Sequence, residues 1–147
     1  MSGFPQRVLV GVDVDAASDR AVETAVQLCA RSGGELHLAH VKLTHPSLRG
    51  RSIGSAQADQ MRSEAETLLA RHADRVDADS GVDLAGRHVR FSRRIEDALV
   101  DLAAEIAADL VVVGTGKAGD VGRRLIGALG RPVPGEVLPA VLVVRHA

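Results

Sequence analysis

The residues best suited to chemistry follow a short apolar run, Leu110–Val113, that ends at Gly114. The segment behind it carries Lys117 and Arg123–Arg124 and continues to Gly127. Four consecutive apolar residues of this kind are typical of a strand buried on both faces of a parallel sheet. Ligands of such sheets bind outside the carboxyl ends of the strands, where backbone N–H groups and cations suit a phosphate. The pattern therefore predicts an anion-binding loop after this strand.

Two better-known glycine motifs do not fit the same segment. Gly114–Gly119 matches G-x-G-x-x-G, but a dinucleotide site needs a helix next and then a strand that ends in an acidic residue. The next apolar run ends at Arg145 instead. A P-loop would need glycine at position 111 and a hydroxyl at 118, where the chain has Val111 and Ala118. Both nucleotide motifs are therefore disfavoured.

Other candidate groups have structural explanations that we favour. Asp13 and Asp15 could form a carboxylate pair, but a ligand-facing residue at a strand end and a helix N-cap explain them better. The histidines show no metal-ligand spacing; they are His37, His40, His45, His72, His88 and His146. We expect His40 to be a half-buried sheet residue with a hydrogen-bond partner, on the strand face opposite His37. Cys29 is expected to be an inert core thiol. No catalytic residue and no metal site is predicted.

Composition and charge restrict the class of protein. The chain has 147 residues, of which 46% are apolar and 25% charged, as is ordinary for one globular domain. The formal net charge of −1 gives no general attraction to nucleic acid or to acidic membranes. The absence of Trp and Tyr disfavours single-stranded nucleic acid as a partner, because stacking platforms are missing. One cysteine, no run of 18 apolar residues and no apolar stretch in Met1–Arg7 predict a cytoplasmic protein.

The hydrophobic pattern alternates between strands and helices along the chain. Apolar runs predict strands at residues 7–12, 35–41, 82–91, 110–113 and 141–144. Helical spacing predicts one helix capped by Asp15 and ended by Gly33, a second with apolar positions from Met61 to Val76, and a third capped by Ser92. Lys42–Ala58 and the segment between the last two strands are expected to be loops. This alternation predicts an α/β fold with a parallel sheet between two helix layers.

The same segments resemble the universal stress protein family over nearly the whole chain. Leu9–Asp13 resembles the family's opening strand with its terminal aspartate, and Glu35–Val41 resembles its second strand. Asp109–Gly114 resembles the strand before its phosphate loop, and Val141–Arg145 its closing strand. The resemblance implies a single domain over residues 1–147 with the adenine nucleotide alpha hydrolase-like fold. That fold is an open five-stranded parallel sheet of order 3-2-1-4-5, with helices on both faces and a crevice between strands one and four.

The resemblance also implies where a nucleotide would bind. In the ATP-binding branch of the family, the loop reads glycine, two residues, glycine, nine residues, glycine, and then Ser or Thr. Laid on this chain without a gap, the motif begins at Gly114 and its third glycine is Gly127. Its second glycine falls on Lys117 and its hydroxyl position on Ala128, so two of four positions depart. The remaining predicted binding residues are Asp13 and Val41 beside the adenine, with Val12 and Val113 in the pocket wall.

Three departures from the motif weaken the predicted phosphate loop. A side chain at Lys117 occupies space that a glycine leaves for phosphate, although its ammonium can contact an anion as a point charge. Ala128 lacks a hydroxyl. The family's helix begins after the third glycine, whereas this chain has Pro132 and Pro134, and an interior proline costs a helix about 3 kcal/mol or more. We expect no helix running on from Ala128, and at most a short one beginning near either proline.

Three functions remain open at this point. The first is a dimeric, non-enzymatic stress-response module that binds ATP or AMP weakly in the crevice. The second is a protein–protein adaptor of the same fold that binds no nucleotide. The third, a slow ATP hydrolase, ranks last because the sequence offers no base or metal ligand beyond Asp13. The expected partners are an unidentified protein and a second copy, paired through the edge strand Val141–Val144.

Overall fold

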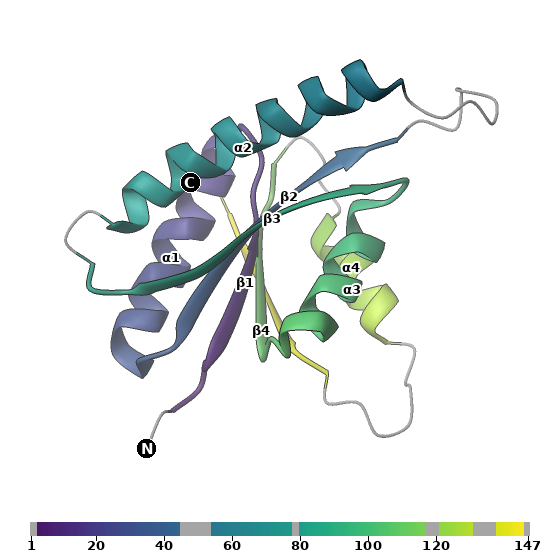
Figure 1. The fold of residues 1–147 in the computed structure, drawn as a ribbon. Helices are drawn as coiled ribbons and strands as arrows, with labels where there is room; N and C mark the ends of the chain where they lie inside the picture. The colour runs from purple at the N-terminus through teal and green to yellow at the C-terminus, as the bar shows by residue number, and fades with distance from the viewer. Residues whose placement is uncertain (1–2, 45–53, 78–79, 117–120, 131–137, 146–147) are drawn as a thin grey trace.

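The computed structural model contains one parallel sheet with helices on both sides (Figure 1). It describes residues 3–44, 54–77, 80–116, 121–130 and 138–145. In chain order the elements are β1 Arg7–Gly11, α1 Ala16–Ser32, β2 Glu35–Leu43, α2 Ser55–Asp77, β3 Asp83–Ser92, α3 Ile95–Ile106, β4 Leu110–Gly114, α4 Val121–Leu129 and β5 Ala140–Val144. The strand order is β3-β2-β1-β4-β5, which confirms the predicted fold class and topology.

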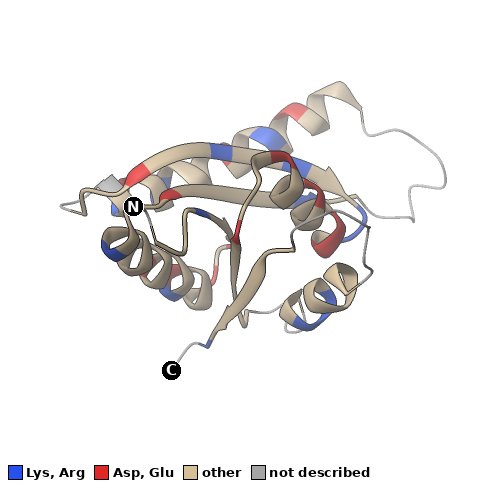
Figure 2. Ribbon diagram, turned by 90° about the horizontal axis from the view of Figure 1, so that it is seen from below, with Lys and Arg blue, Asp and Glu red and all other residues tan. Residues whose placement is uncertain are grey.

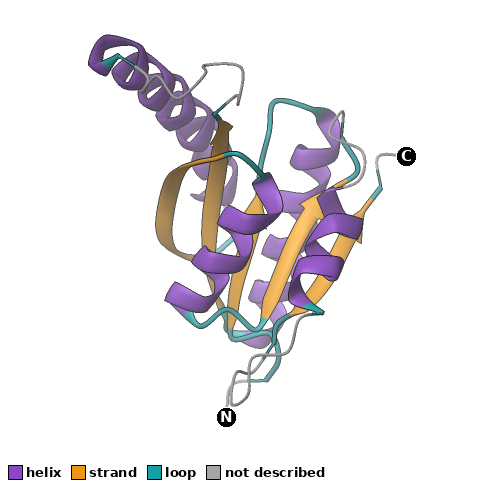
Figure 3. Ribbon diagram, turned by 90° about the vertical axis from the view of Figure 1, so that its right-hand side faces the viewer, coloured by secondary structure: helices purple, strands orange, loops and turns teal. Residues whose placement is uncertain are grey.

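Two apolar layers hold the helices on the sheet. On one face α1 and α2 cover a core that includes Val8, Val10 and Leu38. On the other face α3 and α4 cover Leu9, Val111 and Val113; in Figure 3 this second layer lies in front of the sheet. Successive residues of β1 and β4 thus point into opposite cores, as expected for strands buried on both faces.

Helix α1 begins and ends where its sequence signals predict. The Asp15 side chain caps it by accepting a hydrogen bond from the Ser18 N–H at 2.8 Å. Gly33 ends it with φ of 77°, a left-handed conformation in which glycine carries no Cβ penalty. At α3 the expected cap is wrong: Arg94 occupies the N-cap position, and the Ser92 hydroxyl instead bonds the Arg94 backbone.

Helix α4 is the main difference from the expected fold. The segment expected to be a glycine- and arginine-rich loop is helical over Val121–Leu129. Its apolar residues Val121, Leu125 and Leu129 are spaced at i, i+4 and i+8 and are buried, so packing on the sheet outweighs the low helix propensity of its glycines.

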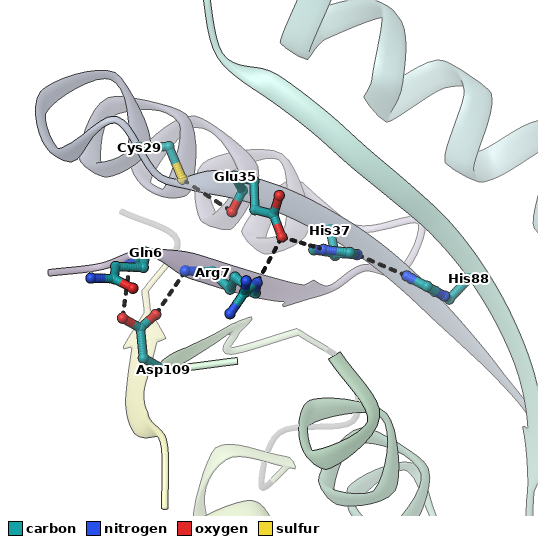
Figure 4. A network of polar contacts seen from close by, with 7 residues as sticks. All are labelled: Gln6, Arg7, Cys29, Glu35, His37, His88 and Asp109. Atoms are coloured by element: carbon teal, nitrogen blue, oxygen red, sulfur yellow. Dashed lines mark hydrogen bonds and ion pairs between the residues drawn. The ribbon is translucent and has the colours of Figure 1, made fainter. Parts of the chain in front are cut away.

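A polar network joins β1, β2 and β3 to Asp109, the residue before β4 (Figure 4). The Asp109 carboxylate accepts hydrogen bonds from the Gln6 and Arg7 N–H groups, at 2.7 and 2.9 Å. Arg7 pairs with Glu35 at 2.9 Å. The network continues along β2 to His37 and crosses to His88 on β3. These contacts fix the register of β1 against its neighbours far from the carboxyl ends of the strands.

In the view of Figure 2, acidic and basic positions are interspersed along the helices and strands. Across the α3–α4 contact, Arg124 pairs with Glu96 at 3.3 Å. No helix among the described residues is long and apolar enough to span a bilayer.

Candidate functional site

The fold indicates a ligand site at the point where its strand order reverses. After β1 the chain continues to β2 on one side, and after β4 it continues to β5 on the other. β1 and β4 are parallel neighbours with Gly11 opposite Val113, so their carboxyl ends open side by side. In open α/β sheets this switch point is where ligands bind.

A pocket lies at this switch point. It is lined by the ends of β1, β2 and β4 together with the first residues of α1, α3 and α4. Its apolar walls are formed by Val12, Val41, Ile95, Leu99, Val113 and Val121. Apolar walls with a few convergent polar groups are typical of small-molecule sites. We call this pocket the crevice.

The turn between β1 and α1 brings two carboxylates into the crevice, those of Asp13 and Asp15. Asp13 accepts a hydrogen bond from the Val14 N–H at 2.8 Å, and its own N–H donates to the Ser18 hydroxyl at 2.8 Å. Asp15 caps α1, as described above. Three hydrogen bonds among its own side-chain and backbone groups therefore hold the turn before any ligand arrives.

Two buried histidines, His40 and His72, contact backbone carbonyls of the same turn. His40 on β2 donates from Nδ1 to the Val12 carbonyl at 2.7 Å, and it lines the crevice. It is buried and hydrogen-bonded, so the expected partner is confirmed, although the side chain is more buried than expected. His72 on α2 is fully buried, with Nε2 3.4 Å from the Asp13 carbonyl. Burial lowers the pKa of His72, so the imidazole stays neutral against this carbonyl.

Gly114, at the end of β4, is required by a close approach between backbones. A Cβ built there would lie 2.6 Å from the carbonyl carbon and oxygen of Ala17 in the first turn of α1. At Gly116 a Cβ would fall on the Asp15 carboxylate. The chain leaving β4 thus passes directly over the start of α1, and Asp15 lies against it.

Five of the eight predicted binding residues line the crevice: Val12, Asp13, Val41, Val113 and Gly114. Lys117 lies outside the described residues. Gly127 and Ala128 do not line the crevice, and their contact with a bound nucleotide stays a prediction. They lie six and seven residues into α4, which carries them about 9–10 Å along the helix axis. There they border a surface groove with Arg94 and Asp97.

The arginines of the expected basic loop are instead helical residues of α4. Arg124 pairs with the buried carboxylate of Glu96 on α3, and Arg123 is exposed. Neither arginine lines the crevice. Helix α4 ends at Leu129, so no helix begins at Ala128, as expected. The alternative of a short helix near Pro132 or Pro134 lies outside the described residues.

Comparison with known proteins agrees with this geometry. The sequence pattern that defines the Universal stress protein family matches residues 5–145. The chain belongs to this family. No curated protein sequence is significantly similar to it.

Solved universal stress proteins share the fold over almost their whole length. A family member from Burkholderia pseudomallei is 26% identical, with a TM-score of 0.70 and 95% of each chain covered. A universal stress protein in complex with cAMP is 29% identical, with a TM-score of 0.64 and coverage of 95% of this chain and 96% of that one. A universal stress protein from Archaeoglobus fulgidus in complex with dAMP is 20% identical, with a TM-score of 0.69 and coverage of 97% and 99%; this similarity concerns the fold alone.

Several crevice residues of this universal stress protein were not expected from the sequence. They are Asp15, Ser18, Ile95, Leu99, Gly116 and Val121. Most belong to the first turns of helices or directly follow a strand, the places that meet at the carboxyl edge of a parallel sheet. The spacing of Val121, Leu125 and Leu129 was a usable signal for α4, and hence for the position of Val121.

The other side chains with shifted pKa values, Cys29 and His88, do not line the crevice. Burial raises the pKa of the Cys29 thiol to about 11, so it stays protonated and unreactive, as expected for a core cysteine. Burial also lowers the pKa of His88, with His37 and Arg90 adding to the effect. Among the described residues, no group of three or more His, Cys, Asp or Glu side chains could hold a metal ion.

Proposed function

We propose that this universal stress protein is a non-enzymatic regulatory module that binds an adenine nucleotide, AMP or ATP, weakly in the crevice. The observation that carries the proposal is the pocket at the β1–β4 switch point, which has apolar walls and Asp13 among its lining residues. A solved family member 29% identical to this chain is in complex with cAMP, which supports the same class of ligand.

The walls of the crevice suit a flat, weakly polar ring. Val41 on β2 and Val113 on β4 belong to the same apolar layer and offer aliphatic surface on which an adenine can pack, and Val12, which directly follows β1, also lines the pocket. The Asp13 carboxylate is an acceptor suited to the exocyclic amino group. Its orientation is already set by the Val14 N–H, so little side-chain entropy remains to be lost on binding.

We expect weak rather than tight nucleotide binding, because few groups of the crevice suit the phosphates. Gly127 is exposed on α4, Ala128 is half-buried, and neither residue lines the crevice. The described residues that line the crevice include no Lys or Arg. The motif therefore contributes its first glycine, Gly114, without the third glycine or a hydroxyl beside it.

A regulatory role fits the groups in the crevice better than catalysis does. His40 already donates a hydrogen bond from Nδ1 to the Val12 carbonyl. The Ser18 hydroxyl already accepts a hydrogen bond from the Asp13 N–H. The described lining offers no nucleophile activated by a neighbouring base. We include in the proposal a homodimer through β5, an unidentified protein partner and a cytoplasmic location, which a lone cysteine permits.

The proposal is tested by denaturing the purified protein, assaying released ATP, ADP and AMP, and titrating AMP and ATP by calorimetry. We expect micromolar or weaker AMP binding. Ile95→Trp, at the start of α3 in the crevice wall, should fill the pocket and weaken AMP binding at least tenfold. Val100→Trp is the matched control, because Val100 is equally half-buried on α3 but does not line the crevice. If no nucleotide is released and none binds in the titration, the result favours the nucleotide-independent adaptor.

A further inference from the structure

Asp15 occupies the end of the crevice where a nucleotide would place its phosphates. The strands that line the crevice follow one another across the sheet in the order β2-β1-β4. Val41 marks the β2 end and Gly114 and Gly116 mark the β4 end. In the proposed binding mode the base lies beside Val41 and Asp13, and the phosphates then extend toward Gly116. The Asp15 carboxylate lies directly against Gly116.

The N-terminus of α1 already has an anionic side chain bound to it. The first N–H groups of a helix and its dipole form a ready anion site. Here the Asp15 carboxylate is that anion, because it accepts the Ser18 N–H at 2.8 Å. The Val14 N–H is taken by the Asp13 carboxylate and the Asp13 N–H by the Ser18 hydroxyl. The turn therefore presents two carboxylates to the crevice, while three of its N–H donors are used internally.

We infer that Asp15 is a specificity-determining residue that makes the crevice select adenosine and adenosine monophosphates over ATP. The inference rests on the proposed function, since it concerns the ligand of the same site. A fixed negative charge repels each added phosphate, and inside a protein such repulsion is screened far less than in water. The penalty therefore grows with phosphate number, whereas the uncharged nucleoside is unaffected.

The test removes the charge and keeps the helix cap. Asp15→Asn and Asp15→Ser both retain a side-chain oxygen that can accept the Ser18 N–H, because Asn, Asp and Ser are comparable N-caps. Adenosine, AMP and ATP are titrated by calorimetry against the native protein and each variant, with ATP measured both in EDTA and in Mg²⁺. Thermal unfolding verifies that the variants fold. Glu23→Gln, an exposed position on α1, is the control with the same change in net charge.

We expect both Asp15 variants to bind ATP about tenfold more tightly than the native protein does, AMP more tightly by a smaller factor, and adenosine unchanged. Glu23→Gln should leave all three affinities unaltered. If adenosine binds but the ratio of ATP to adenosine affinity stays the same in both variants, the inference fails and the proposed function stands. Loss of ATP binding in the variants only with Mg²⁺ would assign Asp15 to cation binding and overturn the inference. If no protein binds adenosine or AMP, both fail together.

Discussion

At the level of single residues, the two glycines that begin and end the family motif have opposite roles in this chain. Gly114 leaves no room for a side chain, because a Cβ would lie 2.6 Å from the Ala17 carbonyl. Gly127 is exposed on α4, and a Cβ there meets nothing within 4 Å. One glycine is needed for a close backbone approach, and the other only lowers helix propensity.

We therefore expect Gly114→Ala to lower the free energy of unfolding by about 1–3 kcal/mol, because either β4 or the first turn of α1 must move. The same movement should weaken nucleotide binding in the crevice. Urea unfolding and calorimetric titration measure the two effects.

Gly127→Ala is the matched control and should raise the free energy of unfolding by about 0.5–1 kcal/mol, since alanine is the better helix former. Nucleotide affinity should not change. A Gly127→Ala protein that folds but loses AMP binding would contradict the placement of Gly127 outside the crevice.

At the level of elements, the contact between β2 and β3 includes a pair of imidazoles that sequence reasoning missed. His37 Nδ1 and His88 Nε2 are 3.0 Å apart. The pairing of the strands shifts register between Leu36 and His37. This places Gly86 beside both rings, where a Cβ would lie within 2.9 Å of each. The 51-residue separation of the two histidines left no local signal in the sequence.

The lowered pKa of His88 predicts a loss of stability in acid. Burial is the main cause, and the other charged or titratable groups that act on this imidazole are His37, Arg90 and Glu105. Because the folded pKa lies below the ordinary value of 6.5, the unfolded chain binds protons more readily. The contribution of His88 is therefore complete above about pH 6.5 and is lost as the pH falls toward its lowered folded pKa.

Urea unfolding between pH 8 and pH 5 tests this. In His88→Gln, whose amide can still donate to His37, the free energy of unfolding should fall less steeply with acidification than in the native protein. The difference should stay below about 1.4 kcal/mol per pH unit, the limit for one proton, since His88 is half-buried and partly screened. If the free energy of unfolding falls equally steeply with pH in both proteins, His88 does not contribute to the pH dependence.

The elements also show which parts of the fold the sequence could predict. β1 and β4 are unbroken apolar runs, and α1 has both its Asp15 cap and its Gly33 stop, so local signals agreed with tertiary packing. Helix α4 contains Gly122 and Gly127, whose low helix propensity disfavours a helix in this segment. Its stability comes from burial of its apolar stripe, with Gly122 allowing close contact to Val143 on β5, which only the assembled fold supplies.

The candidate site divides in the same way. Residues that directly follow a strand, such as Asp13 and Gly114, could be assigned to the crevice because strand ends meet at one edge. Gly127 was assigned by motif spacing alone. It lies outside the crevice because Val121–Leu129 is a helix, and the rise of that helix carries Gly127 along its axis away from Val121 in the crevice wall.

At the level of the whole molecule, β5 is a sheet edge whose outer side has no neighbouring strand among the described residues. The Ala140 N–H donates to the Asp109 carbonyl at 3.0 Å and so points toward the β4 side. Alternate residues of a strand point their N–H groups to the same side, so those of Val141 and Val143 point outward. Leu138 and Val143 are also unusually exposed for their type. An apolar edge of this kind is stabilised by pairing with a second copy.

We expect the native protein to be a dimer at micromolar concentration and Val143→Lys to weaken the dimer at least tenfold, because a twofold axis brings two added charges together. Leu43→Lys is the matched control, since Leu43 and Val143 are similarly exposed, at 42% and 38%, and Leu43 ends β2 rather than lying on β5. Sedimentation equilibrium measures the dissociation constants, and urea unfolding shows that both variants fold. A monomeric native protein would contradict the homodimer, and a Val143→Lys dimer as tight as the control would place the dimer interface of this universal stress protein away from β5.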